Sequence, residues 1–283
     1  MSARGAARVV LLVAILAVAL IAAAILARIG RGEPLRAATF NIERFPKGDG
    51  QASGAFDLLK ALEVDVVGVQ EITNPEVFAR EARARLGPSW RFVAAERSPP
   101  MRVGVLFDAA RFDLVSTRTY DAIRTSERDR PAFEARLTRA GRPGPTLRVI
   151  VVHLKATSEG LDIRRRQHRA LAPILRAAAD SGDEVLLLGD FNATEIEDRQ
   201  MLQELAVGAG LSWVSKGLDC TAYWSRDDGC LGSRLDHVIA WDRRARVKAR
   251  GPCEEEGCAT KDRCPVFTER VSDHCPVTVD LRF

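Results

Sequence analysis

Two spacings of apolar residues alternate along most of the chain. Apolar runs bounded by turn residues predict strands, and apolar positions three and four residues apart predict helices. The predicted strands are Ala37–Ile42, Val64–Val69, Trp90–Ala95, Arg102–Phe107, Phe112–Thr117, Phe133–Thr138, Leu147–Leu154, Val185–Leu188, Leu235–Trp241 and Pro276–Leu281. The predicted helices are Ser53–Glu63, Asn74–Leu86, Asp162–Ala179 and Glu195–Leu205. This order of elements predicts one α/β domain of two packed mixed sheets covered by helices.

The strand Val185–Leu188 is the most informative one. It is apolar at every position, as in a strand buried on both faces, and then stops at Gly189. An acid and an amide follow, Asp190 and Asn192. Both types of residue also cap turns, so this stretch taken alone is compatible with a structural or a functional role.

Other predicted strands also end on polar residues. These endings are Asn41, Gln70-Glu71, His153, Asp236-His237 and, just before the last strand, Asp273-His274. Ligands and catalytic groups collect at the carboxyl ends of strands in open α/β sheets. The repetition therefore predicts one edge lined with acids, amides and histidines. On a strand His237 points away from Asp236, so we interpret His237 as structural.

The amino terminus has a different pattern. Val9–Ala27 is an uninterrupted run of 19 apolar residues, preceded by Arg4 and Arg8 without an acid. It is long enough to span a bilayer, which predicts either a signal anchor or a cleaved signal peptide. Residues 1–35 are assigned to this segment and 36–283 to the catalytic domain. Both readings place the domain outside the cytoplasm, anchored to the membrane or secreted.

Charge does not indicate a globally basic body. The formal charge is +4, but four arginines precede the first acidic residue, and the rest of the chain has 38 basic and 38 acidic residues. Nucleic-acid binding would need a local basic patch. The run 164–169, with four arginines and His168, is either a solvated helix face or a surface that faces phosphates.

The six cysteines all lie in the last quarter of the chain. In an exported protein they predict up to three disulfides, with 15 connectivities open. We expect a Cys220–Cys230 bond, because it would close a short loop. The stretch Gly251–Cys264 has no periodicity and is predicted to be a loop; the cysteine spacing within it is not that of a usual zinc site.

The polar strand ends suit metal-assisted phosphoester chemistry. Carboxylates such as Glu71, Asp190 and Asp273 are ligands for a hard divalent ion, and Mg²⁺ takes its remaining ligands from water and phosphate. A histidine held by a carboxylate can accept a proton from water or stabilise the pentavalent phosphorus. The sequence has neither a covalent-nucleophile arrangement nor a glycine-rich phosphate loop. We therefore expect direct attack by water, with Mn²⁺ or Ca²⁺ as alternatives to Mg²⁺.

Six motifs in order resemble the endonuclease/exonuclease/phosphatase superfamily, of deoxyribonuclease I type. They are Thr39-Phe40-Asn41-Ile42, Val69-Gln70-Glu71, His153-Leu154, Gly189-Asp190-Phe191-Asn192, Leu235-Asp236-His237 and Ser272-Asp273-His274-Cys275-Pro276. The resemblance covers residues 37–283. It implies a four-layer α-β-β-α sandwich and hydrolysis of phosphodiesters or phosphomonoesters with Mg²⁺.

The resemblance also implies roles for single residues. Glu71 matches the principal metal ligand, with Asn41 beside it and Asp273 near the metal. Asp190 matches the acid that orients or activates water, and Asn192 the amide that holds the phosphate. His274 matches the histidine at the scissile phosphate, Asp236 the carboxylate that orients it, and His153 the second histidine of the deoxyribonuclease-like branch. Arg130 matches, more loosely, a phosphate-binding arginine.

These features favour an extracytoplasmic, monomeric endonuclease with nucleic acid as its substrate. His153 and the arginine-rich helix support this interpretation. The alternative is a phosphatase or phospholipid phosphodiesterase, of inositol-phosphate or sphingomyelinase type, with the same catalytic centre. Its expected location beside a membrane favours the alternative. The sequence shows no exposed aromatic hairpin for lipid insertion, which argues against it.

Overall fold

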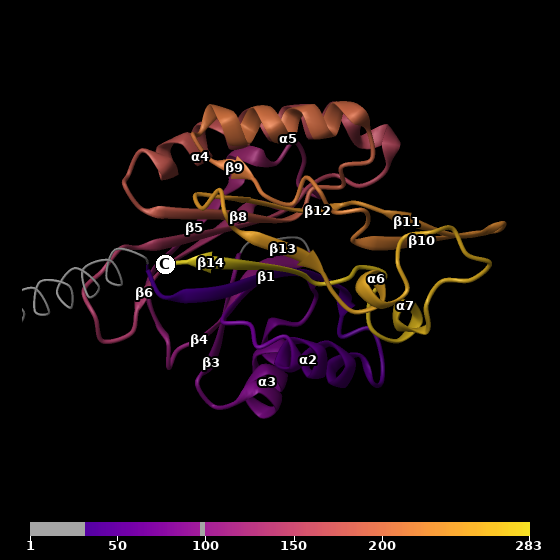
Figure 1. Ribbon diagram of the computed structural model, residues 1–283, viewed down its shortest axis with the longest axis horizontal. Helices are drawn as coiled ribbons and strands as arrows, with labels where there is room; N and C mark the ends of the chain where they lie inside the picture. The colour runs from indigo at the N-terminus through magenta and orange to yellow at the C-terminus, as the bar shows by residue number, and fades with distance from the viewer. Residues whose placement is uncertain (1–31, 97–99) are drawn as a thin grey trace, which may run out of the picture. The chain divides into compact units, whose positions relative to one another are not determined.

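A computed structural model describes residues 32–96 and 100–283 (Figure 1). Within these ranges, Leu35–Leu281 form one compact unit. No helix in the described ranges is long and apolar enough to cross a membrane. The membrane segment expected at Val9–Ala27 lies outside the described residues, so the anchor and the domain boundary after residue 35 stay predictions.

The first sheet has six strands in the order β13-β14-β1-β2-β4-β3. The strands are β1 (Pro34–Phe45), β2 (Val66–Ile72), β3 (Trp90–Ala94), β4 (Arg102–Asp108), β13 (Arg246–Ala249) and β14 (Val277–Arg282). β1 and β2 run parallel, joined by α2 (Gln51–Ala61). α2 and α3 (Pro75–Leu86) pack on this sheet through buried Phe56 and Phe78. As predicted, Asn74 caps α3, accepting a hydrogen bond from Val77 N at 3.1 Å.

The second sheet also has six strands, in the order β5-β6-β7-β8-β12-β9. They are β5 (Phe112–Tyr120), β6 (Ala132–Arg139), β7 (Leu147–His153), β8 (Glu184–Asp190), β9 (Ser212–Trp213) and β12 (Asp236–Ala240). β7 and β8 are parallel and are linked through α4 (Leu161–Ala179). α4 and α5 (Ile196–Gly208) pack on the sheet through Leu171 and Leu202. The short 3-10 helices η1 (Asp121–Ile123) and η2 (Ser158–Gly160) lie in the connections.

The two sheets pack face to face (Figure 1), and β2 and β4 of the first sheet contact β7 of the second. Gly68 on β2 shows how close they are, because a Cβ atom there would collide with the Leu188 side chain on β8. The α2–α3 pair covers one sheet and the α4–α5 pair covers the other. The α/β fold with two packed mixed sheets and flanking helices is therefore confirmed.

A disulfide-bonded lobe is built from segments on both sides of β12 in the sequence and was largely missed by sequence patterns. It contains the hairpin β10 (Ala222–Arg226) and β11 (Gly229–Ser233), with α6 (Pro252–Glu255) and α7 (Val266–Arg270). α6 lies inside the stretch predicted to be a loop. The disulfides are Cys220–Cys258, Cys230–Cys264 and Cys253–Cys275, and all six cysteines are paired, which leaves no thiolate for zinc.

The prediction of a Cys220–Cys230 disulfide was wrong. In the hairpin Cys230 lies opposite Ser225, five residues along the strand from Cys220. At about 3.3 Å per residue that is roughly 16 Å, well beyond the Cα separation a disulfide tolerates. Closeness in sequence therefore does not bring these cysteines together, because the hairpin keeps Cys230 near its turn.

Candidate active site

The strands bring the predicted site residues to one edge. His153 and Asp190 end the parallel strands β7 and β8 and are register partners. Asp236 begins β12, antiparallel to β8, and also lies opposite Asp190. On the other sheet Asn41 and Glu71 lie on the parallel strands β1 and β2. Nonlocal pairing thus turns separate strand ends into one cluster.

The backbone at this edge adopts unusual conformations. Glu71 and Asn192 have φ angles of 63° and 49°, which side-chain-bearing residues adopt only at a cost of roughly 1–3 kcal/mol. Gly189 has φ 148°, and a Cβ there would collide with the Val152 backbone of β7. The glycine before Asp190 is therefore required for the close approach of β7 and β8. Strain concentrated here is consistent with a functional site.

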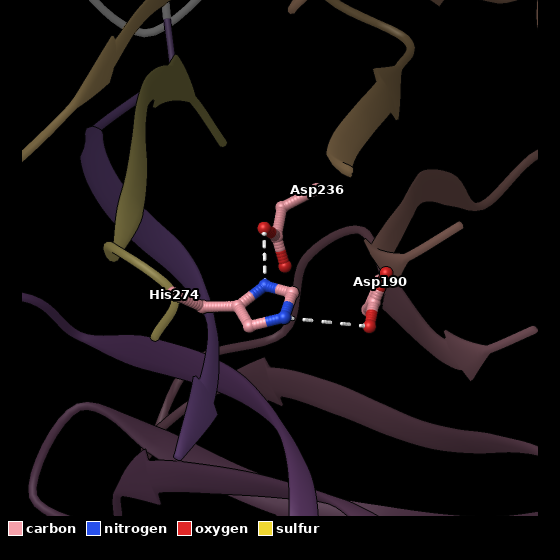
Figure 2. Close-up of side chains that lie close together, drawn as sticks. All are labelled: Asp190, Asp236 and His274. Atoms are coloured by element: carbon pink, nitrogen blue, oxygen red, sulfur yellow. Dashed lines mark hydrogen bonds and ion pairs between the residues drawn. The ribbon is translucent and has the colours of Figure 1, made fainter. Parts of the chain in front are cut away.

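Asp190 lies at the centre of the cluster. Its Oδ2 accepts a hydrogen bond from Asn41 Nδ2 at 3.1 Å and lies 3.3 Å from His153 Nε2 and 3.8 Å from His274 Nε2. Its Oδ1 accepts the Asn192 N–H at 2.9 Å. Figure 2 shows Asp190 and Asp236 on either side of the His274 ring. Burial, together with the nearby Asp236 and Glu71 carboxylates, raises the pKa of Asp190 to about 7, although His274 opposes the shift.

His274 forms a buried ion pair with Asp236. Its Nδ1 lies 2.8 Å from Asp236 Oδ2, and its Nε2 points toward Asp190 (Figure 2). Burial alone would lower the pKa of His274. The carboxylates of Asp236 and Asp190 outweigh this and raise that pKa well above its ordinary value. His274 is therefore the cationic histidine of the pair that flanks Asp190.

His153 has the opposite protonation preference. Burial, with the positive charges of Arg130 and His274 nearby, lowers the pKa of His153 well below its ordinary value. A neutral His153 can donate its Nε2 proton to Asp190, and Glu71 Oε1 is 3.9 Å from the same nitrogen. Within the described residues, its buried Nδ1 has no hydrogen-bond partner. Two histidines with opposite shifts beside one carboxylate are suited to divided acid and base roles.

The remaining predicted residues border the same cluster. Asn41 also donates to Glu71 Oε1 at 3.4 Å, and Asn192 uses its side-chain amide on the Leu154 carbonyl at 3.2 Å. Burial raises the pKa of Asp273, and Glu43 and Glu71 add to this while His274 opposes it. Burial lowers the pKa of Arg130, but the Glu71 and Asp190 carboxylates attract its charge. All nine predicted residues therefore gather at this edge, although their roles stay predictions.

One group in this cluster has the spacing of metal ligands. One potential ligand atom from each of Asp190, Asp236 and His274 lies within 4.8 Å of the others. His274 and Asp236 are already joined by a short hydrogen bond, which is typical of an acid–base pair. We therefore expect a hard cation to bind carboxylates such as Glu71 and Asp273 rather than the imidazole.

Sequence patterns missed the residues that hold this cluster in place. Thr221 donates to Asp236 Oδ2 at 2.8 Å. Ser272 donates to the Asn41 carbonyl at 2.7 Å and accepts the His274 N–H at 3.0 Å. The Thr221–Asp236 and Ser272–Asn41 contacts join segments distant in sequence. Only Ser272 had a local signal, since it begins the motif that contains His274.

The arginine-rich run divides between two roles: Arg166 and Arg169 are exposed, as on a solvated helix face, whereas Arg164 and His168 are buried. Arg164 is fully buried in α4 and forms a bidentate ion pair with Asp198 of α5, with both oxygens at 2.7 Å. It also donates to the Lys155 and Thr157 carbonyls and to Thr194 Oγ1. Arg164 thus joins the segments that follow His153 and Asn192. His168 is buried as well, so neither residue belongs to a solvated face or contacts a phosphate at the site.

Fold and site together define a phosphoester hydrolase. The chain belongs to the Endonuclease/Exonuclease/phosphatase family, whose model matches residues 38–274. The resemblance seen in the sequence is therefore confirmed, and so is the expectation of a phosphodiesterase or phosphatase enzyme. No curated protein matches the sequence.

Solved structures show the same deoxyribonuclease I-like fold. D. rerio TDP2 complexed with single-strand DNA product is 17% identical, with TM-score 0.66 over 89% of this chain and 100% of that one. The human Nocturnin catalytic domain with bound sulfate is 19% identical, with TM-score 0.66 over 88% and 94%. ANGEL2, a 2',3'-cyclic phosphatase, is 16% identical, with TM-score 0.65 over 89% and 96%. At these identities the likeness shows the fold alone.

Proposed function

We propose that the protein is a Mg²⁺-dependent phosphodiesterase that cleaves nucleic acid outside the cytoplasm. The observation that carries this proposal is the Asp190 carboxylate, which lies between a neutral His153 and a cationic His274. This arrangement can accept a proton from water on one side and hold a phosphate on the other. The three disulfides fit a secreted or extracytoplasmic protein.

The charge balance supports a divalent cation. The cluster holds the carboxylates of Glu71, Asp190, Asp236 and Asp273, with Glu43 paired to Lys47 at 2.7 Å at its border, against the positive charges of Arg130 and His274. Buried carboxylates without a counter-charge cost several kcal/mol each, on the order expected for desolvated ions. Glu71 and Asn41, with Asp273, are the residues we expect to hold Mg²⁺, with Mn²⁺ or Ca²⁺ as substitutes. When bound, the ion neutralises negative charge on the phosphate.

Different side chains of the protein then carry out the separate proton transfers. Asp190, with a pKa of about 7, accepts the proton of the attacking water. His274, held by Asp236, donates from Nε2 to the phosphate as negative charge develops. Arg130 and the second amide proton of Asn192 are available to bind phosphate oxygens, since Asn192 uses one proton on Leu154.

Two observations bear on the natural substrate. Arg164 is buried against Asp198 and cannot contact a nucleic acid, whereas Arg166 and Arg169 of the same helix are exposed. One observation favours a phospholipid phosphodiesterase: the hairpin β10–β11 carries Trp224, whose surface is 56% exposed. The sequence had given no sign of an exposed aromatic hairpin. Asp227 and Asp228 at the turn of this hairpin oppose deep insertion into a bilayer, so we retain nucleic acid as the primary substrate.

A substrate panel tests both candidates. The full-length chain is assayed with Mg²⁺ or with EDTA on plasmid DNA, single-stranded oligonucleotides, RNA, bis(p-nitrophenyl) phosphate and phospholipid vesicles. We expect Mg²⁺-dependent cleavage of nucleic acid that Glu71→Ala and His274→Ala abolish. His237→Gln, at a buried histidine outside the site, serves as the control. Unchanged turnover in the first two variants refutes the mechanism, and cleavage of phospholipid alone establishes the second candidate.

A further inference from the structure

Thr221 connects the disulfide lobe to the catalytic pair. It immediately precedes β10 and is fully buried. Its carbonyl accepts the Cys275 N–H at 2.7 Å, and the next residue, Ala222, pairs with His274 through an isolated β-bridge. The backbone at Thr221 is therefore fixed to the segment that carries His274.

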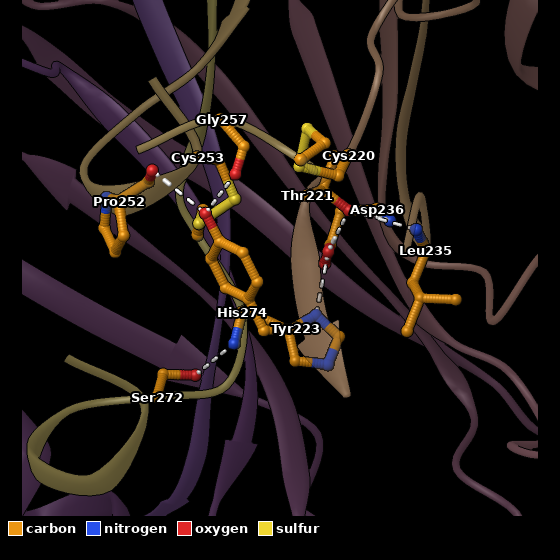
Figure 3. Close-up of a disulfide and its surroundings, with 12 residues drawn as sticks. Cys220, Thr221, Tyr223, Leu235, Asp236, Pro252, Cys253, Gly257, Ser272 and His274 are labelled. Carbon is orange, nitrogen blue, oxygen red and sulfur yellow. Dashed lines mark hydrogen bonds and ion pairs between the residues drawn. A yellow bond between two sulfur atoms is a disulfide. The ribbon is translucent and has the colours of Figure 1, made fainter. Parts of the chain in front are cut away.

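The Thr221 hydroxyl can donate its proton in only one direction. Its Oγ1 accepts the N–H groups of Leu235 at 3.0 Å and Asp236 at 2.9 Å. A hydroxyl has two lone pairs and one proton, so both acceptor positions are occupied. The proton is then directed to Asp236 Oδ2, 2.8 Å away, the same oxygen that contacts His274 Nδ1 (Figure 3).

The hydrogen bond from Thr221 matters more because the other carboxylate oxygen of Asp236 makes none. Asp236 Oδ1 is buried and has no hydrogen-bond partner among the described residues. Without the Thr221 hydroxyl, the carboxylate would therefore keep only His274 as a side-chain partner. The carboxylate could then rotate, and the direction in which it holds the imidazole would no longer be fixed.

We propose that Thr221 is a positioning residue for the hydrolysis. It holds the Asp236 carboxylate as a fixed acceptor for the Nδ1 proton of His274 and thereby sets the ring orientation of the imidazolium, with Nε2 directed toward Asp190. The inference rests on the proposed function, because it assigns a role in the reaction that His274 carries out.

Ser215, in the turn after β9, provides a matched control because its hydroxyl also contacts β12. Its buried hydroxyl accepts the Val238 N–H of β12 at 2.8 Å and lies 3.3 Å from His237 Nδ1. Like Thr221, it caps a β12 amide and contacts a buried side chain of that strand. The contact at Ser215, however, leads to a histidine outside the site.

The kinetic test compares Thr221→Val, Thr221→Ser and Ser215→Ala in the full-length chain. We expect Thr221→Val to lower kcat about 10- to 100-fold, the effect of losing a hydrogen bond to a charged group, with KM changed less than twofold. Thr221→Ser keeps the hydroxyl and should retain kcat within about threefold. Ser215→Ala should lower the melting temperature without lowering kcat.

The outcomes that overturn the proposal are specific. Unchanged kcat in Thr221→Val does so, and Thr221→Ala replaces this variant if valine prevents folding. A loss of kcat in Thr221→Ser, or equal losses in Thr221→Val and Ser215→Ala, points to a structural role alone. Bis(p-nitrophenyl) phosphate is the substrate used, because it makes no demand on base or lipid recognition.

A spectroscopic measurement separates this inference from the proposed function. The Nδ1 proton of His274, bonded to Asp236, is expected at low field in the ¹H NMR spectrum and is assigned by its loss in His274→Gln. It should shift or broaden in Thr221→Val and remain in Ser215→Ala. If the wild-type chain hydrolyses none of the panel substrates, the proposed function fails, whereas this resonance still tests the role of Thr221. An unperturbed resonance in Thr221→Val refutes it.

Discussion

The disulfides allow stability and catalysis to be separated by experiment. Cys253–Cys275 and Cys230–Cys264 close loops with sequence separations of 22 and 34 residues. The chain-entropy relation assigns these loops about 3.4 and about 3.8 kcal/mol of stabilisation. If the bonds acted only on stability, removal of the longer loop would have the larger effect on every property of the protein.

Their positions predict the opposite order for activity. Cys275 follows His274 directly, and its N–H is bonded to the carbonyl of Thr221. Cys230 lies on β11 and pairs with Lys261, away from the catalytic pair. Loss of the Cys253–Cys275 bond should therefore loosen the 2.8 Å contact between His274 and Asp236. Since acid–base catalysis contributes about 10²–10⁴-fold, we expect kcat to fall by at least about tenfold.

The assay compares Cys253→Ala/Cys275→Ala with Cys230→Ala/Cys264→Ala. Chemical denaturation measures the free energy of unfolding, and initial rates at a temperature where both variants are folded measure kcat. We expect the first variant to be the less destabilised and the less active. Equal kcat in the two variants, or full activity in the first, would refute the idea that this disulfide braces His274.

Three other predictions test the buried charges. Arg164→Met removes one partner of a buried ion pair and should lower the free energy of unfolding by about 3–5 kcal/mol in denaturant. Arg165→Met removes a surface ion pair and should lower it by less than about 1 kcal/mol. Similar losses in the two variants contradict the structure. Burial lowers the pKa of His168 to about 4, so between pH 6.5 and 5 the unfolded chain binds more protons than the folded one, and stability falls as the pH falls. His168→Gln should reduce this slope by about 1.4 kcal/mol per pH unit, and an unchanged slope argues against a neutral buried histidine. Glu71→Gln should weaken Mn²⁺ binding in calorimetry by at least about tenfold, and unaltered affinity removes Glu71 from the metal site.

The regular elements were predictable because their cores are periodic. β8 is apolar at four successive positions, and α3 begins at an Asn-Pro pair and ends before a glycine. β10, β11 and β13 were not predicted, since each has only four or five residues and no run of apolar residues long enough to indicate a strand. They depend on disulfides and neighbouring strands rather than on a local apolar pattern. The prediction of a Cys220–Cys230 disulfide failed for the same reason, because the spacing of the two cysteines does not reveal the hairpin register that separates them.

The residues of the site likewise include some that the sequence predicts and some that it does not. Residues at strand ends, such as Glu71 and Asp190, could be predicted because polar groups are unexpected after buried apolar runs. Thr221 and Arg164 could not, because their function depends on partners 15 and 34 residues away. An arginine in a run of basic residues normally faces solvent, and only the burial of Asp198 opposite it reverses this expectation.

The two histidines beside Asp190 show how burial alone does not decide protonation. Both His153 and His274 are buried, and burial lowers the pKa of each. His274 has a second carboxylate, Asp236, within hydrogen-bonding distance, whereas His153 has Arg130 among its electrostatic neighbours. The charged His274 and the neutral His153 therefore differ because of the groups that lie behind each ring. Because Asp236 lies directly behind His274, whatever fixes this carboxylate also controls the positive charge of His274.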